Sequence, residues 1–367
     1  MNNEDKLIAE LVKIYTDALD KLQKKITSKV TLGRATAYER SLYRQVKEEL
    51  EKLKKDSSEA VKKLAQSSYK KGLDSLLKDI ESVEKRSYNL FSGLNVGQIE
   101  LIADNLTRDL NNAVNLIGRR YDDLIRRVTL EATAKKLSQG QTIRRMQKQL
   151  AEELRKNNIH YVEYANGNKH GIKSYANMAA RSTTAEAQNK AKTVQGTEWG
   201  YDLVRMTSHY PTCEICTMYQ GRVYALTKEA ANGKYKDKNG KPLRFPYLYD
   251  TAFADGYETI HPNCRHRISI LPARAYTLDE LARFSRMSMQ PFEDNRPDNE
   301  RKAYAAEQAT KRKRNESYRQ YQDVKAHLPN DAPKTFAAWQ RMKQANSQRY
   351  QDLMADYRYI TKRINTP

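Results

Sequence analysis

A long, regular run of apolar residues constrains this chain more than any other feature of its sequence. Between residues 97 and 137, apolar side chains recur mostly at steps of three and four, which places them on one face of an α-helix. These residues are Ile99, Ile102, Leu106, Leu110, Ala113, Ile117, Tyr121, Leu124 and Val128. Because a long helix gains most of its stability from packing of such a face, we expect a fold dominated by packed helices.

Helical spacing continues on both sides of this run. Residues 4–27, 36–90, 142–154 and 172–195 show it as well, the last with several alanines. From residue 277 onward the chain is again helical and basic, with interruptions at prolines. Hydrophobic residues make up 39% of the chain and charged residues 30%, a balance that suits long, half-exposed helices better than one large compact core.

The pattern changes near residue 200. Residues 203–206, 222–225 and 267–271 resemble short strands, because they are apolar and bounded by turn-forming residues. A polar insertion that contains Gly233 and Gly240 reads as a loop. This part of the chain therefore predicts a small mixed α/β domain.

Together these patterns predict a mainly α protein with four parts. We expect a helical arm at residues 1–90, a central helical domain at 91–199, a small α/β domain that binds a metal at 200–275, and a basic helical tail at 276–367. A length of 367 residues is compatible with several units of this kind. The arm is rich in Lys and Glu, so we expect it to be exposed and available to a partner.

All three cysteines fall in the predicted α/β domain. Cys213 and Cys216 form a C-x-x-C pair, and His261 and Cys264 form an H-x-x-C pair. The two pairs supply three sulfurs and one imidazole, a set suited to tetrahedral Zn²⁺. Four protein ligands leave no position for water, so we expect a structural site. An odd, small number of cysteines also argues against a disulfide framework and indicates a reducing compartment.

Other interpretations of these residues stay open. The cysteines can be buried, reduced side chains that bind no ion. The C-x-x-C pair can also be a redox pair, although no thioredoxin-like βαβ pattern surrounds it. His209 or His266 can replace one of the four ligands, or can support the site from outside it.

A catalytic interpretation of the same region is a metal-dependent nuclease or another DNA-processing enzyme. Asp250, Asp255 and Glu258 lie near the second ligand pair and, with His261 or His266, would build such a site. A closed set of four ligands argues against it, because a catalytic metal needs an open position. The sequence also contains no phosphate-binding G-x-x-x-x-G-K-[ST] loop and no G-x-S-x-G motif. We therefore expect neither enzymatic activity nor a small-molecule substrate.

The net charge of +21 predicts a polyanionic partner, and nucleic acid is the first candidate. The densest basic run is Lys311, Arg312, Lys313 and Arg314, which lies in a predicted helix. Such a run can bind phosphates without sequence preference. It can instead be a solvated helix face, or it can dock on an acidic protein surface.

The sequence does not indicate a membrane protein. It contains no apolar stretch of the roughly 20 residues that a membrane span needs. Its first residues lack the basic start and apolar core of a signal peptide. We therefore expect a protein that is made in a cytoplasm and remains soluble or assembled there.

Four segments of the predicted α/β domain resemble one known family. They are 208–216 (SHYPTCEIC), 219–224 (YQGRVY), 247–257 (YLYDTAFADGY) and 261–266 (HPNCRH). Together they resemble the phage minor capsid protein 2 family, which is related to the Mu F-like head morphogenesis proteins. The helical stretch from about residue 90 resembles the family more loosely.

This resemblance implies a structural, non-enzymatic protein of the phage head. It implies a location near the portal vertex, in few copies, with portal and capsid proteins as partners. It also implies non-specific contact with DNA during packaging or ejection. The protein would be present in the virion, and in the host cytoplasm during assembly.

Overall fold

The computed structural model describes residues 3–27, 35–139, 161–163, 169–255, 259–328 and 330–365. Within these residues the protein is mainly helical, which confirms the predicted fold class. The chain divides into two compact units, Met1–Asn295 and Arg296–Pro367. The helix predicted at 142–154 lies outside the described residues.

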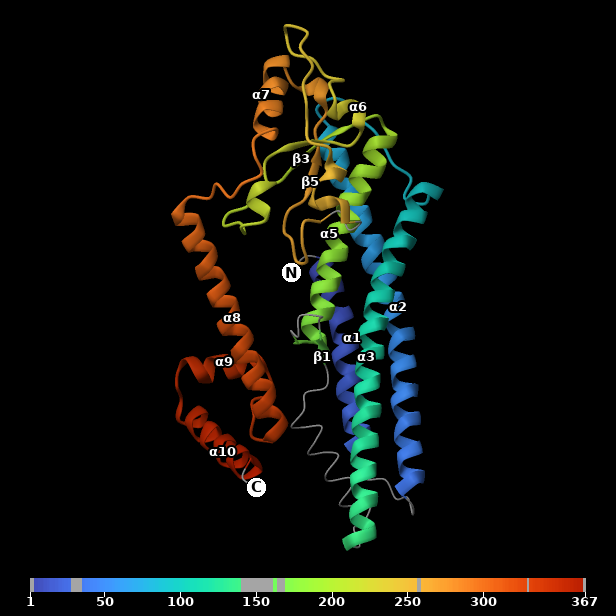
Figure 1. Cartoon of the computed structure of the whole chain (residues 1–367), viewed down its shortest axis with the longest axis vertical. Coiled ribbons are helices and arrows are strands. Elements are labelled where there is room, and N and C mark those ends of the chain that lie inside the picture. The colour runs from blue at the N-terminus through green and yellow to red at the C-terminus, as the bar shows by residue number, and fades with distance from the viewer. Residues whose placement is uncertain are drawn as a thin grey trace. The chain divides into compact units, whose positions relative to one another are not determined.

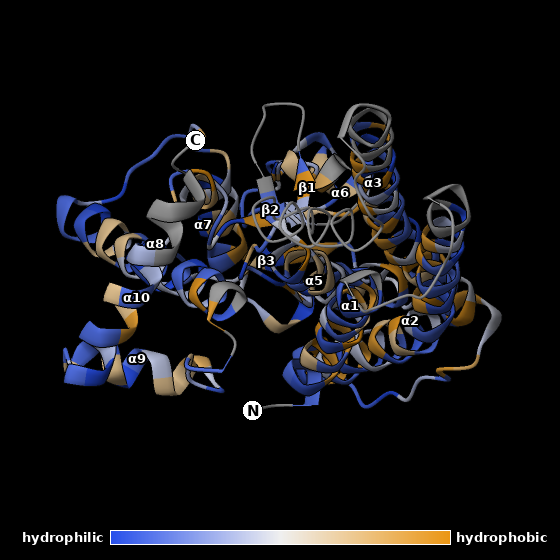
Figure 2. Ribbon diagram, turned by 90° about the horizontal axis from the view of Figure 1, so that it is seen from below, coloured by the Kyte–Doolittle hydropathy of each residue, from blue (hydrophilic) through white to orange (hydrophobic). Residues whose placement is uncertain are grey.

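Long helices form a bundle in the first unit. They are α1 (Asn3–Thr27), α2 (Ala35–Ile80), α3 (Gly93–Gln139) and α5 (Ile172–Glu198). The helices run side by side (Figure 1), and the view along the bundle shows apolar sides of α1, α2 and α3 turned inward (Figure 2). The helix α3 spans the segment whose apolar spacing predicts a long helix, and all the helices named here contribute to one core.

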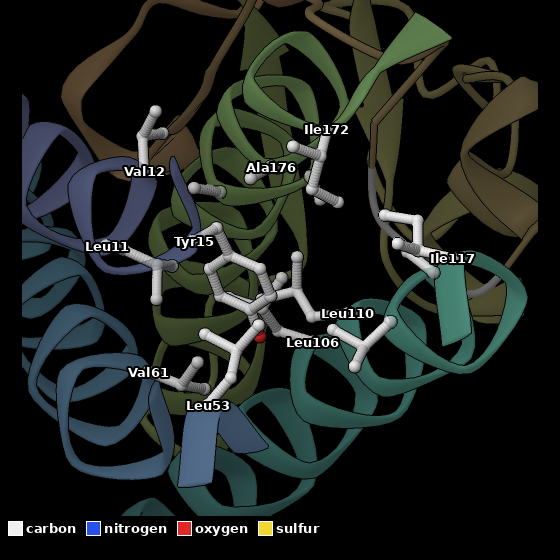
Figure 3. Packing of buried hydrophobic residues seen from close by; sticks show 14 of the residues in the cluster. Leu11, Val12, Tyr15, Leu53, Val61, Leu106, Leu110, Ile117, Ile172 and Ala176 are labelled. Atoms are coloured by element: carbon white, nitrogen blue, oxygen red, sulfur yellow. The ribbon is translucent and has the colours of Figure 1, made fainter. Parts of the chain in front are cut away.

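Tyr15 of α1 lies among the core side chains of the other bundle helices (Figure 3). Its ring is fully buried, and its hydroxyl donates a hydrogen bond of 3.1 Å to Oγ of Ser57 on α2. Burial raises the pKa of the Tyr15 hydroxyl to about 12. A buried hydroxyl needs such a partner, so this contact fixes α1 against α2.

The helices α2 and α5 approach one another closely where both carry small residues. A Cβ atom at Gly72 would lie 2.6 Å from the carbonyl oxygen of Gln188 and 2.7 Å from Cβ of Ala191. These distances are shorter than contacts between real side chains. The alanine-rich face of α5 therefore serves to bring the two backbones together.

The structure differs from the expectation of a separate arm at residues 1–90. Leu11 of α1 and Leu64 of α2 are fully buried in the core that they share with α3 and α5. Glu4, in the first turn of α1, is also buried, and it contacts Lys71 on α2 and Gln188 on α5. The Lys and Glu residues cover only the outer sides of these helices, so the expected boundary at residue 90 falls inside one unit.

A small antiparallel sheet lies at one end of the bundle (Figure 1). It consists of β3 (Leu203–Met206), β4 (Val223–Ala225) and β5 (Ile268–Ile270), with β3 in the centre. These strands confirm the three that the sequence predicts. A two-stranded ribbon of β1 (Tyr161–Glu163) and β2 (Lys169–Gly171) was not expected.

A buried ion pair joins the sheet to the bundle. Nζ of Lys192 on α5 lies 2.9 Å from Oδ2 of Asp79 on α2, and 2.8 Å from the carbonyl oxygen of Ile268 on β5. The same Oδ2 atom accepts the backbone N–H of Ile270 at 3.0 Å. Three elements therefore meet at one pair of charges, and burial raises the pKa of the Asp79 carboxyl.

The first unit continues past the expected boundary at residue 275. The helix α7 (Leu278–Ser288) begins with a capping box formed by Thr277 and Glu280. Its Leu281 and Phe284 are buried in a cluster that also includes residues of the sheet. Because α7 is amphipathic and covers one side of the sheet, it belongs to the α/β region and not to the tail.

The second unit is a small helical body. It contains α8 (Asp298–His327), α9 (Phe336–Gln344) and α10 (Gln348–Asn365). Trp339 is fully buried at its centre, and the Trp339 indole N–H donates a hydrogen bond of 3.1 Å to Oγ of Ser317. Its core uses α8 only from Tyr318 onward, so the basic run at 311–314 precedes the part of the helix that joins the core.

Candidate metal centre

Two loops at the same end of the sheet carry the predicted metal ligands. The strands β3 and β5 are antiparallel neighbours, so the end of β3 lies beside the start of β5. The loop after β3 holds Cys213 and Cys216, and the loop before β5 holds His261 and Cys264. The fold therefore brings together two pairs that are far apart in the sequence.

Each pair forms a tight turn. The backbone N–H of Cys216 donates a hydrogen bond of 3.3 Å to Sγ of Cys213. In the second turn, the backbone N–H of Cys264 donates to the carbonyl oxygen of His261 at 3.0 Å, with Asn263 between them at a φ of 61°. Asparagine is one of the few residues that adopt this left-handed conformation readily. The two turns bring Cys216 next to both His261 and Cys264.

Three of the distances between ligand atoms are near those of a four-coordinate metal site. Sγ of Cys213 and Sγ of Cys216 lie 3.3 and 3.1 Å from Nε2 of His261. Sγ of Cys216 lies 3.6 Å from Sγ of Cys264. Tetrahedral Zn²⁺ with usual bond lengths separates its ligands by about 3.6 to 3.8 Å. Sγ of Cys264 lies close to Cys216 but is not grouped with Cys213 and His261, so binding of one metal by all four side chains requires Cys264 to move toward the other three.

The lowered pKa values of Cys213 and Cys264 favour metal binding, because a metal binds the thiolate form. Contact with the Cys216 thiol lowers the pKa of Cys213 to about 3 and the pKa of Cys264 to about 4. The same contacts raise the pKa of Cys216, and contact with Cys213 raises the pKa of His261 to about 9, so these two side chains must lose a proton when a metal binds. Nδ1 of His261 lies 2.8 Å from the carbonyl oxygen of Pro262, which can only accept, so Nδ1 carries a proton and Nε2 faces the sulfurs.

His266 offers a second set of ligands. Its Nδ1 atom lies 3.7 Å from Sγ of Cys264, and the side chain is buried. Cys216, Cys264 and His266 form one grouping that could hold a metal, and Cys213, Cys216 and His261 form the other. His209 belongs to neither, because its ring packs against the His266 ring at 4.8 Å and its Nε2 contacts Oγ1 of Thr207.

Gln220 is a residue of this site that the sequence analysis did not single out. Its Oε1 atom accepts the backbone N–H of His209 at 3.1 Å and lies 3.2 Å from Nε2 of His266. An amide oxygen only accepts, so Nε2 of His266 carries the proton and Nδ1 faces Cys264. The segment 219–224 contains Gln220, but no ligand spacing points to a supporting amide.

Arg267 connects the site to the bundle. Its guanidinium donates hydrogen bonds to the carbonyl oxygens of Cys264 and His266, at 3.2 and 2.9 Å. Its Nε atom donates to Oε1 of Gln188 on α5 at 2.9 Å. Burial lowers the pKa of the Arg267 guanidinium. Through the hydrogen bond to Gln188, α5 holds the positive charge of Arg267 beside the turn that carries Cys264.

Of the acidic residues in the nuclease interpretation, Asp250 does not join this cluster. Asp250 is exposed at the end of a short 3-10 helix, Leu248–Asp250. Asp255 ends the next one, and Glu258 lies outside the described residues. The metal-binding groupings found among the described residues consist of cysteine and histidine alone.

The basic run lies on α8 in the second unit. Lys311, Arg312, Lys313 and Arg314 are all exposed, and Nζ of Lys311 lies 2.6 Å from a carboxylate oxygen of Glu307 one turn earlier. Consecutive residues on a helix are about 100° apart, so the four side chains surround most of the helix. No more than about half of them can face one surface at a time.

The comparison with protein families decides the identity of the chain. A model of the phage minor capsid protein 2 family matches residues 5–348. The chain belongs to this family. This match confirms the resemblance seen in the sequence, and it extends over both units of the minor capsid protein.

No curated protein matches this minor capsid protein, and no solved structure matches it. None of the helices in the described segments combines the length and apolar character that a membrane span requires. Membership in this family therefore supports a structural role in the phage particle.

Proposed function

We propose that this minor capsid protein is a structural part of a tailed-phage head, located near the portal vertex, where it helps to assemble the DNA-filled particle. Its partners would be portal and capsid proteins and the packaged DNA. The family match carries the proposal, because it includes the bundle, the cysteine-bearing region and most of the second unit. The proposed role requires no catalysis and no small-molecule substrate.

The candidate metal centre is proposed to bind one structural Zn²⁺ through Cys213, Cys216, His261 and Cys264. The sulfur-rich donor set fits Zn²⁺ better than Mg²⁺ or Ca²⁺, which prefer oxygen ligands. Four protein ligands would complete the coordination shell and join the two loops at the end of the sheet. His266, held by Gln220, would then support the site from outside.

The charge of this centre supports the same ligand set. Three thiolates, one neutral imidazole and Zn²⁺ together carry one net negative charge. Arg267 places a guanidinium beside Cys264 through hydrogen bonds to backbone carbonyl oxygens. A partly buried cation is stabilised by a nearby opposite charge, and the metal-thiolate centre would add one to that of Glu4.

The exposed run on α8 is proposed to contact packaged DNA through its phosphates. Lys311, Arg312, Lys313 and Arg314 offer exposed positive charges of the kind that contact phosphate oxygens. The contact would therefore be independent of sequence and would weaken as salt rises. A tail that docks on an acidic protein surface is the competing proposal, and the α8 variant described below separates the two.

A metal-dependent nuclease is the second candidate function, and the cluster does not favour it. Catalysis would need an open metal position and a carboxylate, whereas the groupings among the described residues contain only cysteine and histidine. Incubating the purified protein with supercoiled plasmid and Mg²⁺ or Mn²⁺ tests this candidate. Nicking that is lost in a Cys216→Ser variant would favour the nuclease over the structural role.

The presence of the chain in particles tests the main proposal. DNA-filled heads are purified on a density gradient, and their proteins are quantified by mass spectrometry. We expect the chain in mature heads, in fewer copies than the major capsid protein. Its absence from both mature and DNA-free heads would overturn the structural role.

A further inference from the structure

A short hairpin after α6 (Lys228–Ala231) carries a concentration of positive charge that the proposed function does not use. Residues 228–244 contain six basic and two acidic side chains, a net charge of +4. Residues 234–244, here called the basic hairpin, lie in the α/β region of the first unit. Lys236, Lys238 and Lys241 are exposed on it. The basic hairpin is thus separate in sequence and in unit from the run on α8.

The turn of the basic hairpin is held in one conformation by Asp237. The Oδ1 atom of Asp237 accepts the backbone N–H groups of Asn239 and Lys241, at 2.8 and 2.9 Å. The Asp237 backbone N–H donates to the carbonyl oxygen of Lys241 at 2.9 Å, and Gly240 adopts a φ of 75° to complete the turn. A polar, exposed loop with this many internal hydrogen bonds is rigid without a hydrophobic core of its own.

The base of the basic hairpin is fixed to the sheet. Asp202 is buried, accepts a hydrogen bond from the Tyr235 hydroxyl, and lies 2.5 Å from Nζ of Lys234. The Tyr235 ring packs edge-on against Phe245, with centroids 6.5 Å apart. The backbone N–H of Leu243 donates to the carbonyl oxygen of Tyr235 at 2.8 Å. Both arms of the hairpin are therefore anchored before the turn begins.

The fixed backbone of the basic hairpin leaves its lysines exposed. Tyr235 and Asp237 are half-buried, whereas the residues that alternate with them, Lys234, Lys236 and Lys238, are exposed. Alternate residues of an extended chain lie on the same side, about 7 Å apart. No ion pair engages Lys236 or Lys241 within the described residues, and the ion pair of Lys238 with exposed Asp279 is weak.

We propose that the basic hairpin binds the phosphate backbone of duplex DNA, independently of base sequence and of the run on α8. Fixed backbone geometry lowers the entropy cost of placing several cations against a charged strand. Ammonium groups act as point charges for phosphates, and their contacts release counterions. The protein would then hold DNA at one site in each unit.

Titration of fluorescent duplex DNA with the full-length chain, at several salt concentrations, tests this proposal. The variant Lys236→Gln with Lys238→Gln and Lys241→Gln should flatten the log–log salt slope by about 2 to 3, since each phosphate contact contributes about 0.9. A matched control removes the same charge from the exposed side of α2, at Lys52, Lys55 and Lys62. The control should change the slope by less than about 1. An equal change in both variants would overturn the proposal, because binding would then follow net charge alone.

Two substitutions of Asp237 separate geometry from charge. Asp237→Asn keeps an oxygen that accepts the turn hydrogen bonds, and Asp237→Ala removes it, while both remove the same negative charge. We expect Asp237→Asn to bind DNA at least as tightly as the wild type, and Asp237→Ala to bind several-fold more weakly. Equal tightening by both would overturn the proposal. Wild-type binding by all hairpin variants, with loss only in the α8 variant, would overturn it too and leave the proposed function intact.

Discussion

Replacing Lys192 by methionine tests how the bundle holds the α/β region. The side chains of Lys192 and Asp79 are 6% and 15% exposed, and their charges lie 2.9 Å apart. Methionine keeps the volume and removes the charge, which leaves the Asp79 carboxylate with hydrogen bonds from the backbone N–H of Ile270 and the Ser269 side chain but without a cation. A buried charge that loses its partner is strongly destabilising.

The expected loss in the free energy of unfolding is about 3 to 5 kcal/mol, the usual cost of removing one partner of a buried pair. Denaturant unfolding followed by circular dichroism measures it. Adding Asp79→Asn to Lys192→Met should recover most of the loss, because no unpaired charge then remains. As a control, Lys63→Met breaks an ion pair with Glu59 whose side chains are 58% and 77% exposed, and it should cost less than about 1 kcal/mol.

The loss should also depend on pH. Burial raises the pKa of Asp79 above its usual value, and removing Lys192 takes away a contact that opposes this rise. The folded variant therefore binds a proton more readily than the unfolded chain, so its stability falls as pH rises through the carboxyl range. The difference in the free energy of unfolding between the wild type and the variant should therefore shrink as pH is lowered. A pH-independent loss, or a loss below about 1 kcal/mol at neutral pH, would refute this account of the junction.

Three further predictions concern the ligands, the basic run and the N-terminal helices. His261→Asn should abolish tight zinc binding in a competition assay with a colorimetric chelator, whereas His266→Asn should only weaken it; the reverse order would make His266 the ligand. Replacing Lys311, Arg312, Lys313 and Arg314 with Gln should flatten the salt slope of DNA binding by about 2, because about half of the run faces one surface; an unchanged slope with loss of incorporation into heads would indicate protein docking. Deleting residues 1–85 should give an insoluble chain in a centrifugation assay, because it uncovers the core faces of α3 and α5; a soluble, folded remainder would contradict the shared core.

Helical spacing predicted the long elements well because their apolar positions repeat over many turns. The prediction for 97–137 corresponds to α3, and the strand at 203–206 corresponds to β3. The ribbon of β1 and β2 was missed, since strands of three residues are too short to show a period. The arm at 1–90 was misassigned for a different reason: spacing shows which face of a helix is apolar, but not which helix covers it.

The candidate site was predictable only in part. Ligand chemistry and two-residue gaps pointed to Cys213, Cys216 and Cys264, and antiparallel pairing of β3 with β5 explains how they meet. The choice between His261 and His266 depends on distances that only the folded chain defines. Gln220 had no motif of its own, because its role depends on a neighbour in space.

Zinc content tests the central claim about the candidate metal centre most directly. The full-length chain is purified, refolded in the presence of Zn²⁺, desalted, and examined by elemental analysis and native mass spectrometry. We predict about one Zn²⁺ per wild-type chain, and none tightly bound in a Cys213→Ser variant with Cys264→Ser. A folded wild-type chain that retains no zinc would contradict the claim.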